Sequence, residues 1–219
     1  MRHINNQLRI LFFIFFIKPL LLVLVGLNVF GRQHLPSKPF ILVANHNSHL
    51  DALALMNLFP LHRIAKIRPV AAQDYFTTSP ILNWFSTVLM NILPIPRKGI
   101  TKTNNPLTKM SDALDQGYSL IVFPEGSRGE PEVMESFRSG VGHLIQKHPN
   151  IPVVPVYMRG MGRSLPRGEL ILIPFFCDIV IGKPQHFTGE RPGIVQSVEA
   201  AVKKLEEEHS QMFWEHDNI

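Results

Sequence analysis

A histidine and a carboxylate five positions apart are the residues of this sequence best suited to chemistry. His46 follows the apolar run Phe40–Val43, and Asp51 precedes the apolar stretch Ala52–Met56. A neutral imidazole accepts a proton near neutral pH, and a carboxylate on its other nitrogen fixes the tautomer and stabilises the imidazolium. A tight turn over this spacing would return Asp51 to the His46 ring. Because no nucleophile is attached, the pair suits a base that activates the hydroxyl group of a substrate.

The apolar segments on either side indicate where this pair lies. A short uninterrupted apolar run is typical of a buried strand, so we expect His46 just past the carboxyl end of a strand. Asp51 then lies in the first turn of the following helix. In open α/β sheets, ligands bind in the crevice at that edge. Each residue also has a purely structural interpretation: His46 can bridge a turn, and Asp51 can complement the helix dipole.

A second polar stretch favours the chemical interpretation. Phe123–Gly129 follows another apolar strand-like run, Leu120–Val122, and should therefore open at the same edge of the sheet. Its central residues are Glu125, Gly126, Ser127 and Arg128. Between the two polar stretches, Arg97 and Lys98 follow two closely spaced prolines. Such a loop is stiff and presents fixed positive charge, which suits a phosphate group.

Together the two stretches resemble the glycerolipid acyltransferase family, of the lysophosphatidate acyltransferase type. That family carries the motifs N-H-x-x-x-x-D and F-P-E-G-[ST]-R, and both are present without a gap, at Asn45–Asp51 and Phe123–Arg128. A loose match to a third motif ends at Arg97, and the proline-bracketed apolar segment Ile151–Val156 matches a fourth. The motifs occur in the family's order, and the resemblance covers about residues 40–159.

The resemblance implies an O-acyltransferase of phospholipid synthesis. It would move a fatty acyl group from an acyl thioester directly to the free hydroxyl of lysophosphatidate, giving phosphatidate. His46 would be the base, Asp51 would orient it, and Glu125 would hold Arg128 or its loop. No metal and no bound cofactor are expected; the co-substrate is an acyl-CoA or acyl-carrier-protein thioester.

The same resemblance places the substrate-binding groups. Arg97, Lys98 and Arg128 would bind the acceptor phosphate, for which a planar guanidinium gives paired hydrogen bonds. Backbone amides around Gly126 and Ser127 would stabilise the oxyanion or the phosphate. A separate basic cluster, formed by Arg63, Lys66 and Arg68, is suited to an acidic carrier protein or to anionic lipid.

Several other functions are weighed against this one. The acceptor can be another lysophospholipid or hydroxylated lipid. A serine hydrolase is disfavoured because the sequence has no G-x-S-x-G motif. A metal-dependent hydrolase could use His46, His49 and Asp51, but the sequence supplies no further cluster of ligands. A non-catalytic membrane scaffold is disfavoured because both polar motifs are intact.

Residues 1–32 predict membrane attachment. Ile10–Ile17 and Leu20–Phe30 are almost entirely apolar and are separated by Lys18-Pro19. This length is at the limit for a spanning helix, so a kinked span and an interfacial helix or helix pair both remain open. A cleaved signal peptide lacks its small-x-small site, and a core helix would be unusually apolar. The resemblance favours one-sided attachment, with the catalytic domain cytoplasmic, at the inner membrane face in a bacterium.

Composition limits the remaining choices. The chain has 219 residues, a net charge of +5 and a single cysteine, Cys177, in an apolar run. The positive charge favours a phospholipid surface and phosphorylated substrates, and no nucleic-acid-binding pattern accompanies it. One catalytic domain is expected over residues 33–219. Alternating strand-like and helix-like segments predict an α/β sandwich with a mostly parallel or mixed central sheet flanked by helices.

Overall fold

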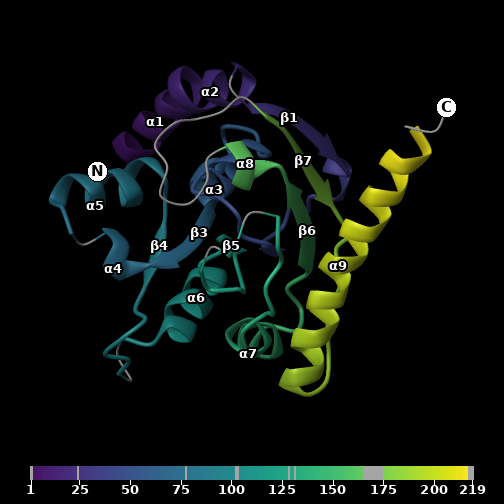
Figure 1. Cartoon of the computed structure of the whole chain (residues 1–219). Helices are drawn as coiled ribbons and strands as arrows, with labels where there is room; N and C mark the ends of the chain where they lie inside the picture. The colour runs from purple at the N-terminus through teal and green to yellow at the C-terminus, as the bar shows by residue number, and fades with distance from the viewer. Residues whose placement is uncertain are drawn as a thin grey trace.

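The centre of the molecule is a seven-stranded sheet in the order β1-β7-β6-β2-β5-β3-β4 (Figure 1). The computed structural model describes residues 2–23, 25–76, 78–101, 104–127, 129–130, 132–164 and 175–216. The strands are β1 (Val25–Phe30), β2 (Ile41–Ala44), β3 (Ile67–Ala72), β4 (Leu93–Ile95), β5 (Ser119–Val122), β6 (Val153–Arg159) and β7 (Phe175–Ile181).

Strand direction puts several loops at one edge. β6, β2, β5, β3 and β4 are mutually parallel, while β7 is antiparallel to β6 and pairs in parallel with β1. This mixed, mostly parallel sheet confirms the predicted α/β class. The carboxyl ends of the parallel strands meet at the same edge, and β2 lies between β5 and β6. The loops that follow β2 and β5 are therefore neighbours, which brings the two polar motifs together.

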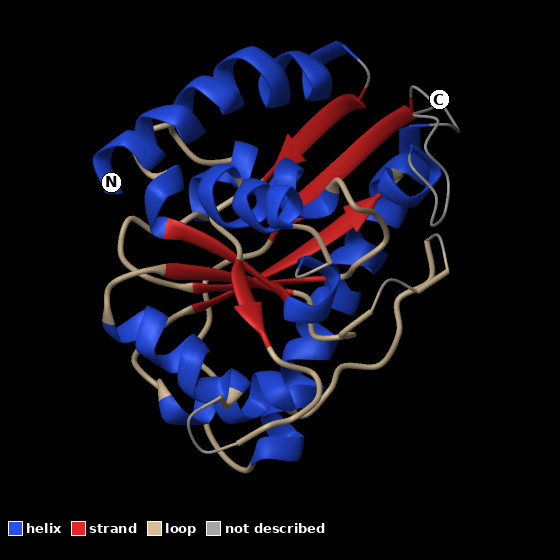
Figure 2. Cartoon of the chain, turned by 90° about the vertical axis from the view of Figure 1, so that its left-hand side faces the viewer, coloured by secondary structure: helices blue, strands red, loops and turns tan. Residues whose placement is uncertain are grey.

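Helices cover both faces of the sheet, in layers that Figure 2 shows above and below the strands. The helices are α1 (Arg2–Phe12), α2 (Lys18–Val23), α3 (Asp51–Asn57), α4 (Gln73–Phe76), α5 (Pro80–Trp84), α6 (Pro106–Asp115), α7 (Gly140–Lys147), α8 (Met161–Ser164) and α9 (Arg191–His216). The described residues also form two π-helical turns, η1 (Phe13–Ile17) and η4 (Phe85–Leu89), and two 3-10 turns, η2 (Arg32–His34) and η3 (Ile64–Lys66).

The side chains of β2 alternate between two buried clusters. Leu42 packs with residues of η1, α2 and α3, whereas Ile41 and Val43 pack with residues of α6, α7 and α9. A strand buried on both faces reads as a continuous apolar run, which is why this one was recognisable in the sequence. Cys177, on β7, is fully buried in the first cluster.

The amino-terminal helical segment runs from α1 through η1 into α2. Residues His3–Val23 are long and apolar enough to cross a membrane by length and composition, and 22% of their most apolar window is buried. The sequence left open a kinked span and a helix or helix pair bent at Lys18-Pro19, and in the structure helical residues continue on both sides of this pair. A proline cannot donate to the carbonyl one turn earlier, and a π-helical turn is a usual way to absorb such a break. Here that turn, η1, lies directly before Lys18.

The fold divides the apolar segment predicted over residues 1–32. Val25–Phe30 is not helical: it forms β1 and pairs in register with β7. Gly26 and Asn28 are poor helix formers, so they disfavour continuation of the helix, whereas valine favours strands. The Asn28 amide also donates to Asp178 Oδ1 of β7 at 2.9 Å. The helical part of the segment therefore ends by Val23, and its last residues belong to the sheet.

Candidate active site

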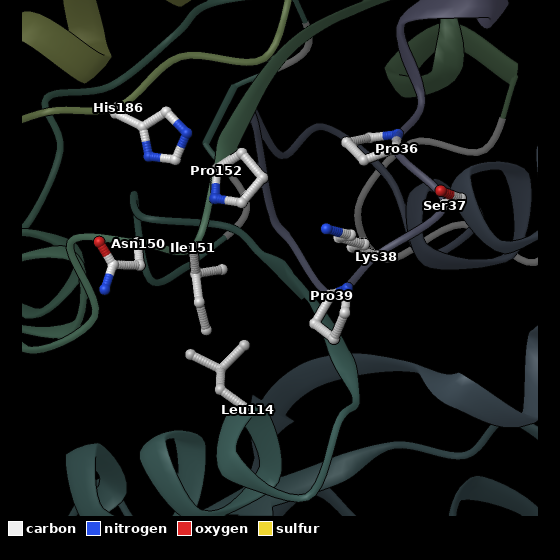
Figure 3. A pocket seen from close by; sticks show the side chains of 9 residues that line it. All are labelled: Pro36, Ser37, Lys38, Pro39, Leu114, Asn150, Ile151, Pro152 and His186. Carbon is white, nitrogen blue, oxygen red and sulfur yellow. The ribbon is translucent and has the colours of Figure 1, made fainter.

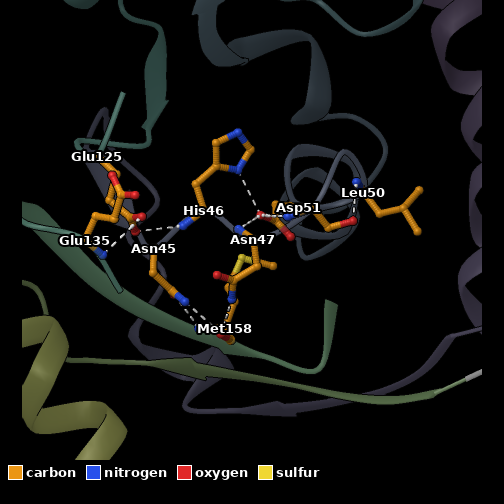
Figure 4. Close-up of polar contacts among 9 residues, drawn as sticks. Asn45, His46, Asn47, Leu50, Asp51, Glu125, Glu135 and Met158 are labelled. Carbon is orange, nitrogen blue, oxygen red and sulfur yellow. Dashed lines mark hydrogen bonds and ion pairs between the residues drawn. The ribbon is translucent and has the colours of Figure 1, made fainter. Parts of the chain in front are cut away.

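His46 and Asp51 meet in the loop between β2 and α3. His46 Nδ1 lies 2.9 Å from Asp51 Oδ2, as Figure 4 shows. Asp51 is completely buried, and the same oxygen accepts the backbone N–H groups of Asn47 at 2.7 Å and Ser48 at 2.8 Å. These two bonds close a tight turn, so the chain itself holds the carboxylate against the ring.

This geometry assigns the two ring nitrogens of His46. A carboxylate accepts only, so the hydrogen on Nδ1 points to Asp51 and Nε2 keeps a lone pair. Nε2 is directed away from Asp51 (Figure 4), and the side chain is 20% exposed. The ring also stacks on Phe123, with centroids 4.1 Å apart and planes at 19°. A histidine held in this way can take a proton from a group that enters from the sheet edge.

Glu125 joins the second motif to the first. Its side chain is 1% exposed, and Oε1 accepts the backbone N–H of His46 at 2.9 Å across 79 positions of sequence. Oε2 accepts the backbone N–H of Glu135 at 3.4 Å. Burial raises the pKa of this carboxyl from 4.5 to about 7, although the two N–H donors partly oppose the shift. Glu125 thus fixes the His46 loop from the β5 side.

Replacing Glu125 by glutamine should remove a pH dependence of stability. The buried carboxyl keeps its proton to a higher pH than it does in an unfolded chain. It therefore favours the folded state fully below pH 4.5 and loses that contribution as the pH rises to about 7. We expect the free energy of unfolding of the parent chain to fall by about 3 kcal/mol relative to Glu125→Gln over this range, and then to stay level.

Denaturant unfolding at about pH 4.5, 6, 7 and 8 measures this difference. Glu130→Gln is the matched control, because Glu130 is an exposed acid in the same loop. Its difference from the parent should not vary over this range. A Glu125→Gln difference that is independent of pH would show that the buried carboxyl ionises at its ordinary pKa.

Positive charge lies beside the Glu125 turn. Arg97, in the loop after β4, donates from Nη2 to the carbonyl oxygen of Gly126 at 2.7 Å. Gly126 has φ +76°, and a Cβ there would lie 2.8 Å from Arg138 Nε, so glycine lets the Arg138 guanidinium approach the turn. The Gly126 N–H closes the turn onto the Phe123 carbonyl. Arg97 and Arg138 are both exposed, so their remaining donors can reach an anion at this edge.

The remaining predicted binding residues are Ser127, Lys98, Arg128 and the basic cluster. Ser127 follows Gly126, and within the described part of the chain its backbone N–H makes no hydrogen bond. Lys98 is exposed next to Arg97. Arg128 lies outside the described residues. The basic cluster Arg63, Lys66 and Arg68 is remote: Lys66 and Arg68 lie over the ring of Tyr118, which precedes β5 and so marks the opposite edge of the sheet.

Asn45 is a positioning residue to which the sequence alone gave no role. Its Oδ1 accepts the Met158 backbone N–H at 2.7 Å, and its Nδ2 donates to the Met158 carbonyl at 2.8 Å. Asn47 Nδ2 also donates to that carbonyl, at 3.2 Å. A primary amide pairs with a backbone in this way because it offers one donor and one acceptor side by side. Asn45 thereby anchors the His46 loop to the end of β6. Its position as the first residue of the N-H-x-x-x-x-D motif was the sequence feature that could have indicated this role.

Nothing among the described residues resembles a metal site. No group of three or more His, Cys, Asp or Glu side chains is close enough to hold an ion there. His49 is exposed and its ring faces Tyr75, with centroids 5.9 Å apart. An open pocket of about 530 Å³ (Figure 3) lies away from His46, between Lys38, Leu114, Pro152 and His186. These residues lie at the amino ends of the strands, so we assign the pocket no part in the chemistry.

Comparison with known proteins decides the family. A family model described as acyltransferase matches residues 26–159. The chain belongs to this acyltransferase family. The matched range contains β2 to β6, all of β1 except Val25, and both polar motifs, and so includes the whole of the site described above.

Individual relatives of this acyltransferase carry more specific names. The chain is 29% identical over 163 residues to the chloroplastic 1-acyl-sn-glycerol-3-phosphate acyltransferase of Arabidopsis thaliana. That match covers 73% of the chain and 44% of the relative. The chain is 29% identical over 186 residues to the human alpha enzyme of that name, covering 82% and 62%. It is 32% identical over 139 residues to the enzyme of that name from Saccharomyces cerevisiae, covering 61% and 44%. The chain thus spans about half the length of the plant and yeast relatives.

A solved structure shows the same fold. The crystal structure of PlsC from Thermotoga maritima, titled a 1-acyl-sn-glycerophosphate (LPA) acyltransferase, superposes with a TM-score of 0.69 at 24% identity. The match covers 94% of this chain and 97% of the other. The mixed sheet, its flanking helices and the apolar amino-terminal helix therefore belong to a fold already seen in a crystal.

Proposed function

We propose that this acyltransferase moves a fatty acyl group from an acyl thioester to the free hydroxyl of lysophosphatidate (1-acylglycerol-3-phosphate), giving phosphatidate. The observation that carries the proposal is the His46–Asp51 pair. It presents a ring nitrogen with a free lone pair at the ligand-binding edge of the sheet, held by a buried carboxylate. The names of the relatives support this acceptor.

The proton balance of the reaction is simple. His46 Nε2 takes the hydroxyl proton of the acceptor as the oxygen attacks the thioester carbonyl carbon. The imidazolium is stabilised by Asp51, at 2.9 Å, while the carbonyl oxygen carries the negative charge. The C–S bond then breaks, and the departing thiolate recovers the proton from His46. In this single displacement no group of the enzyme is acylated.

The cations at the Glu125 turn would receive the acceptor phosphate. Arg97 already donates to Gly126 O, which fixes its guanidinium beside the turn and leaves other N–H groups for an anion. Lys98 adds charge next to it, and the Ser127 backbone N–H offers a further donor. We propose the same role for Arg128. A phosphomonoester carries more negative charge than a phosphodiester, so this set favours lysophosphatidate over lysolipids with larger head groups.

The membrane supplies the acceptor in this proposal. The apolar helix over His3–Val23 would attach the enzyme to the phospholipid surface and leave the catalytic sheet in the cytoplasm, at the inner membrane face in a bacterium. We take residues 33–219 together with β1 as the catalytic body. An acyl-CoA or acyl-carrier-protein thioester would be the donor. The basic cluster Arg63, Lys66 and Arg68 lies at the opposite edge of the sheet from His46, so its charge does not decide between the two donors.

The proposal predicts how Arg97→Ala changes acceptor use. Detergent-purified chain is given labelled oleoyl-CoA or oleoyl-acyl-carrier-protein with lysophosphatidate, lysophosphatidylcholine or monoacylglycerol. Loss of a charge-assisted hydrogen bond to phosphate is worth about 1.5–3 kcal/mol. We therefore expect Arg97→Ala to raise the KM for lysophosphatidate by about 10- to 100-fold and to leave transfer to monoacylglycerol within about twofold.

Arg191→Ala is the control, because Arg191 is an exposed arginine on α9 and belongs to no part of the site. An equal loss with all acceptors would give Arg97 a structural role only. Turnover with lysophosphatidylcholine alone would keep the mechanism and replace the acceptor. No turnover by folded protein with any pair of substrates would overturn the proposed function.

A further inference from the structure

Two large apolar side chains on α5 are exposed without any part in the site. Ile81 is 79% exposed and Trp84 is 50% exposed. They are three positions apart, so they share one face of a short helix. Scattered exposed apolar residues need no explanation, but a contiguous patch usually marks a surface that binds something.

The turn that continues α5 is tied to the amino-terminal helix. Arg9 of α1 is buried and donates to the backbone carbonyls of Leu89 at 3.2 Å and Val88 at 2.8 Å, and to Asn91 Oδ1 at 3.2 Å. Asn91 in turn donates to the carbonyls of Ala65 and Ile67, at the start of β3. Arg9 therefore fixes α1 to η4, and through Asn91 to the sheet. The apolar helix and α5 form one body.

Aromatic rings make the apolar surface continuous between these elements. Phe16 stacks on Phe12 at 5.7 Å, and Phe12 meets Phe85 edge-on at 5.4 Å. Phe16 is 64% exposed, and Phe85 directly follows Trp84. Further large apolar side chains of α1 and η1 are exposed, namely Ile4, Leu8, Leu11, Ile14 and Phe15. In Figure 1, α5 lies beside α1 at the upper left of the molecule.

Charge identifies what such a surface fits. The first 50 residues contain no Asp or Glu, and neither does the stretch 75–111, which holds Arg97, Lys98, Lys102 and Lys109. Both segments are thus apolar with positive charge alone. A lipid leaflet with anionic head groups complements that combination, since apolar side chains enter the acyl region while cations stay at the phosphates. Trp84 suits the boundary, where tryptophan places an apolar ring and an N–H donor.

We propose that α5 is a second membrane-contact element: Ile81 and Trp84 enter the same anionic lipid leaflet as the α1 helix. This inference rests on the membrane attachment proposed above. It also bears on the reaction, because η4 leads through β4 directly to Arg97. A leaflet that holds α5 brings the phosphate-binding loop to the depth at which lysolipid head groups lie.

The test measures where Trp84 lies when the enzyme is on vesicles. Trp84 and Trp214 are the two tryptophans, so Trp214→Phe leaves Trp84 as the reporter. The full chain is bound to vesicles of phosphatidylcholine with about 30% phosphatidylglycerol. We expect Trp84 emission to shift to shorter wavelength, to be quenched by lipids brominated near the head of the acyl chain, and to become about fivefold less accessible to iodide. Iodide quenching unchanged by vesicles would overturn the proposal and assign this face to another partner.

A second measurement tests the energetic contribution of the same face. Ile81→Asp should weaken vesicle binding by about tenfold, because it places a charge in the acyl region. Ala200→Asp adds the same charge on an exposed position of α9, across the sheet, and should leave binding within about twofold. Equal binding by Ile81→Asp and the parent would overturn the proposal.

Activity separates this proposal from the proposed function. Transfer to a short-chain lysophosphatidate dispersed as monomers needs no membrane surface. The Ile81→Asp variant should retain it while losing transfer to vesicle-bound lysophosphatidate. If the parent chain itself lacks transfer to both, the proposed function fails, and the vesicle measurements still decide the role of α5.

Discussion

Acyl transfer should fall by about 10²- to 10⁴-fold when His46 is replaced by alanine. The ring is the group whose free Nε2 accepts the hydroxyl proton, and the described residues place no second base against Asp51. Folding should be retained, because the variant keeps the hydrogen bond of 2.9 Å from the backbone N–H of position 46 to Glu125. The assay follows release of thiol from oleoyl-CoA with lysophosphatidate as acceptor, and circular dichroism checks the fold.

His49→Ala is the matched control for this variant. His49 lies in the same loop, is exposed and contacts Tyr75 rather than Asp51. We expect the activity of His49→Ala to stay within about threefold of the parent. A chelator should leave the activity of the variant and of the parent unchanged. If the two histidine variants lost activity equally and chelator had the same effect, a shared metal would replace the general base. Retained transfer in folded His46→Ala would exclude His46 as the base.

Asp51→Asn should cost about 10²- to 10⁴-fold in kcat with little change in stability. Asparagine can place its carbonyl oxygen where Oδ2 lies and still accept from Asn47 and Ser48. Its amide nitrogen would occupy the position of Oδ1, which has no hydrogen-bond partner among the described residues. What is lost is the negative charge that stabilises the imidazolium, so the loss should fall on kcat and leave KM nearly unchanged.

Asp51→Ala separates this electrostatic role from a structural one. It leaves the two backbone N–H groups and the His46 ring without their buried acceptor. We expect a loss of about 3 kcal/mol in the free energy of unfolding, in addition to the loss of activity. If Asp51→Asn were as destabilised as Asp51→Ala, the activity loss would follow from a distorted loop. If Asp51→Asn kept parental kcat, the carboxylate would have no part in stabilising the transition state.

The local parts of this site could be predicted from the sequence because their geometry is local. Five positions separate His46 from Asp51, and a turn of that length leaves few conformations, so the residue types and their spacing implied the contact. The apolar runs before His46 and Glu125 likewise predicted two buried strands, and parallel strands place the loops after them at one edge. The α/β class followed from the same alternation of segments.

Contacts between distant segments needed the tertiary structure, because hydrophobic patterns do not state which strands are neighbours. Glu125 reaches the His46 backbone across 79 positions, and Asn45 reaches Met158 across 113, since β2 lies between β5 and β6. The raised pKa of Glu125 depends on burial that exists only once those strands are assembled. Residues 25–30 are apolar enough for a membrane helix, and only pairing with β7 makes them a strand. The sequence by itself determined the residues that do the chemistry; the order of the strands decided what holds them in place.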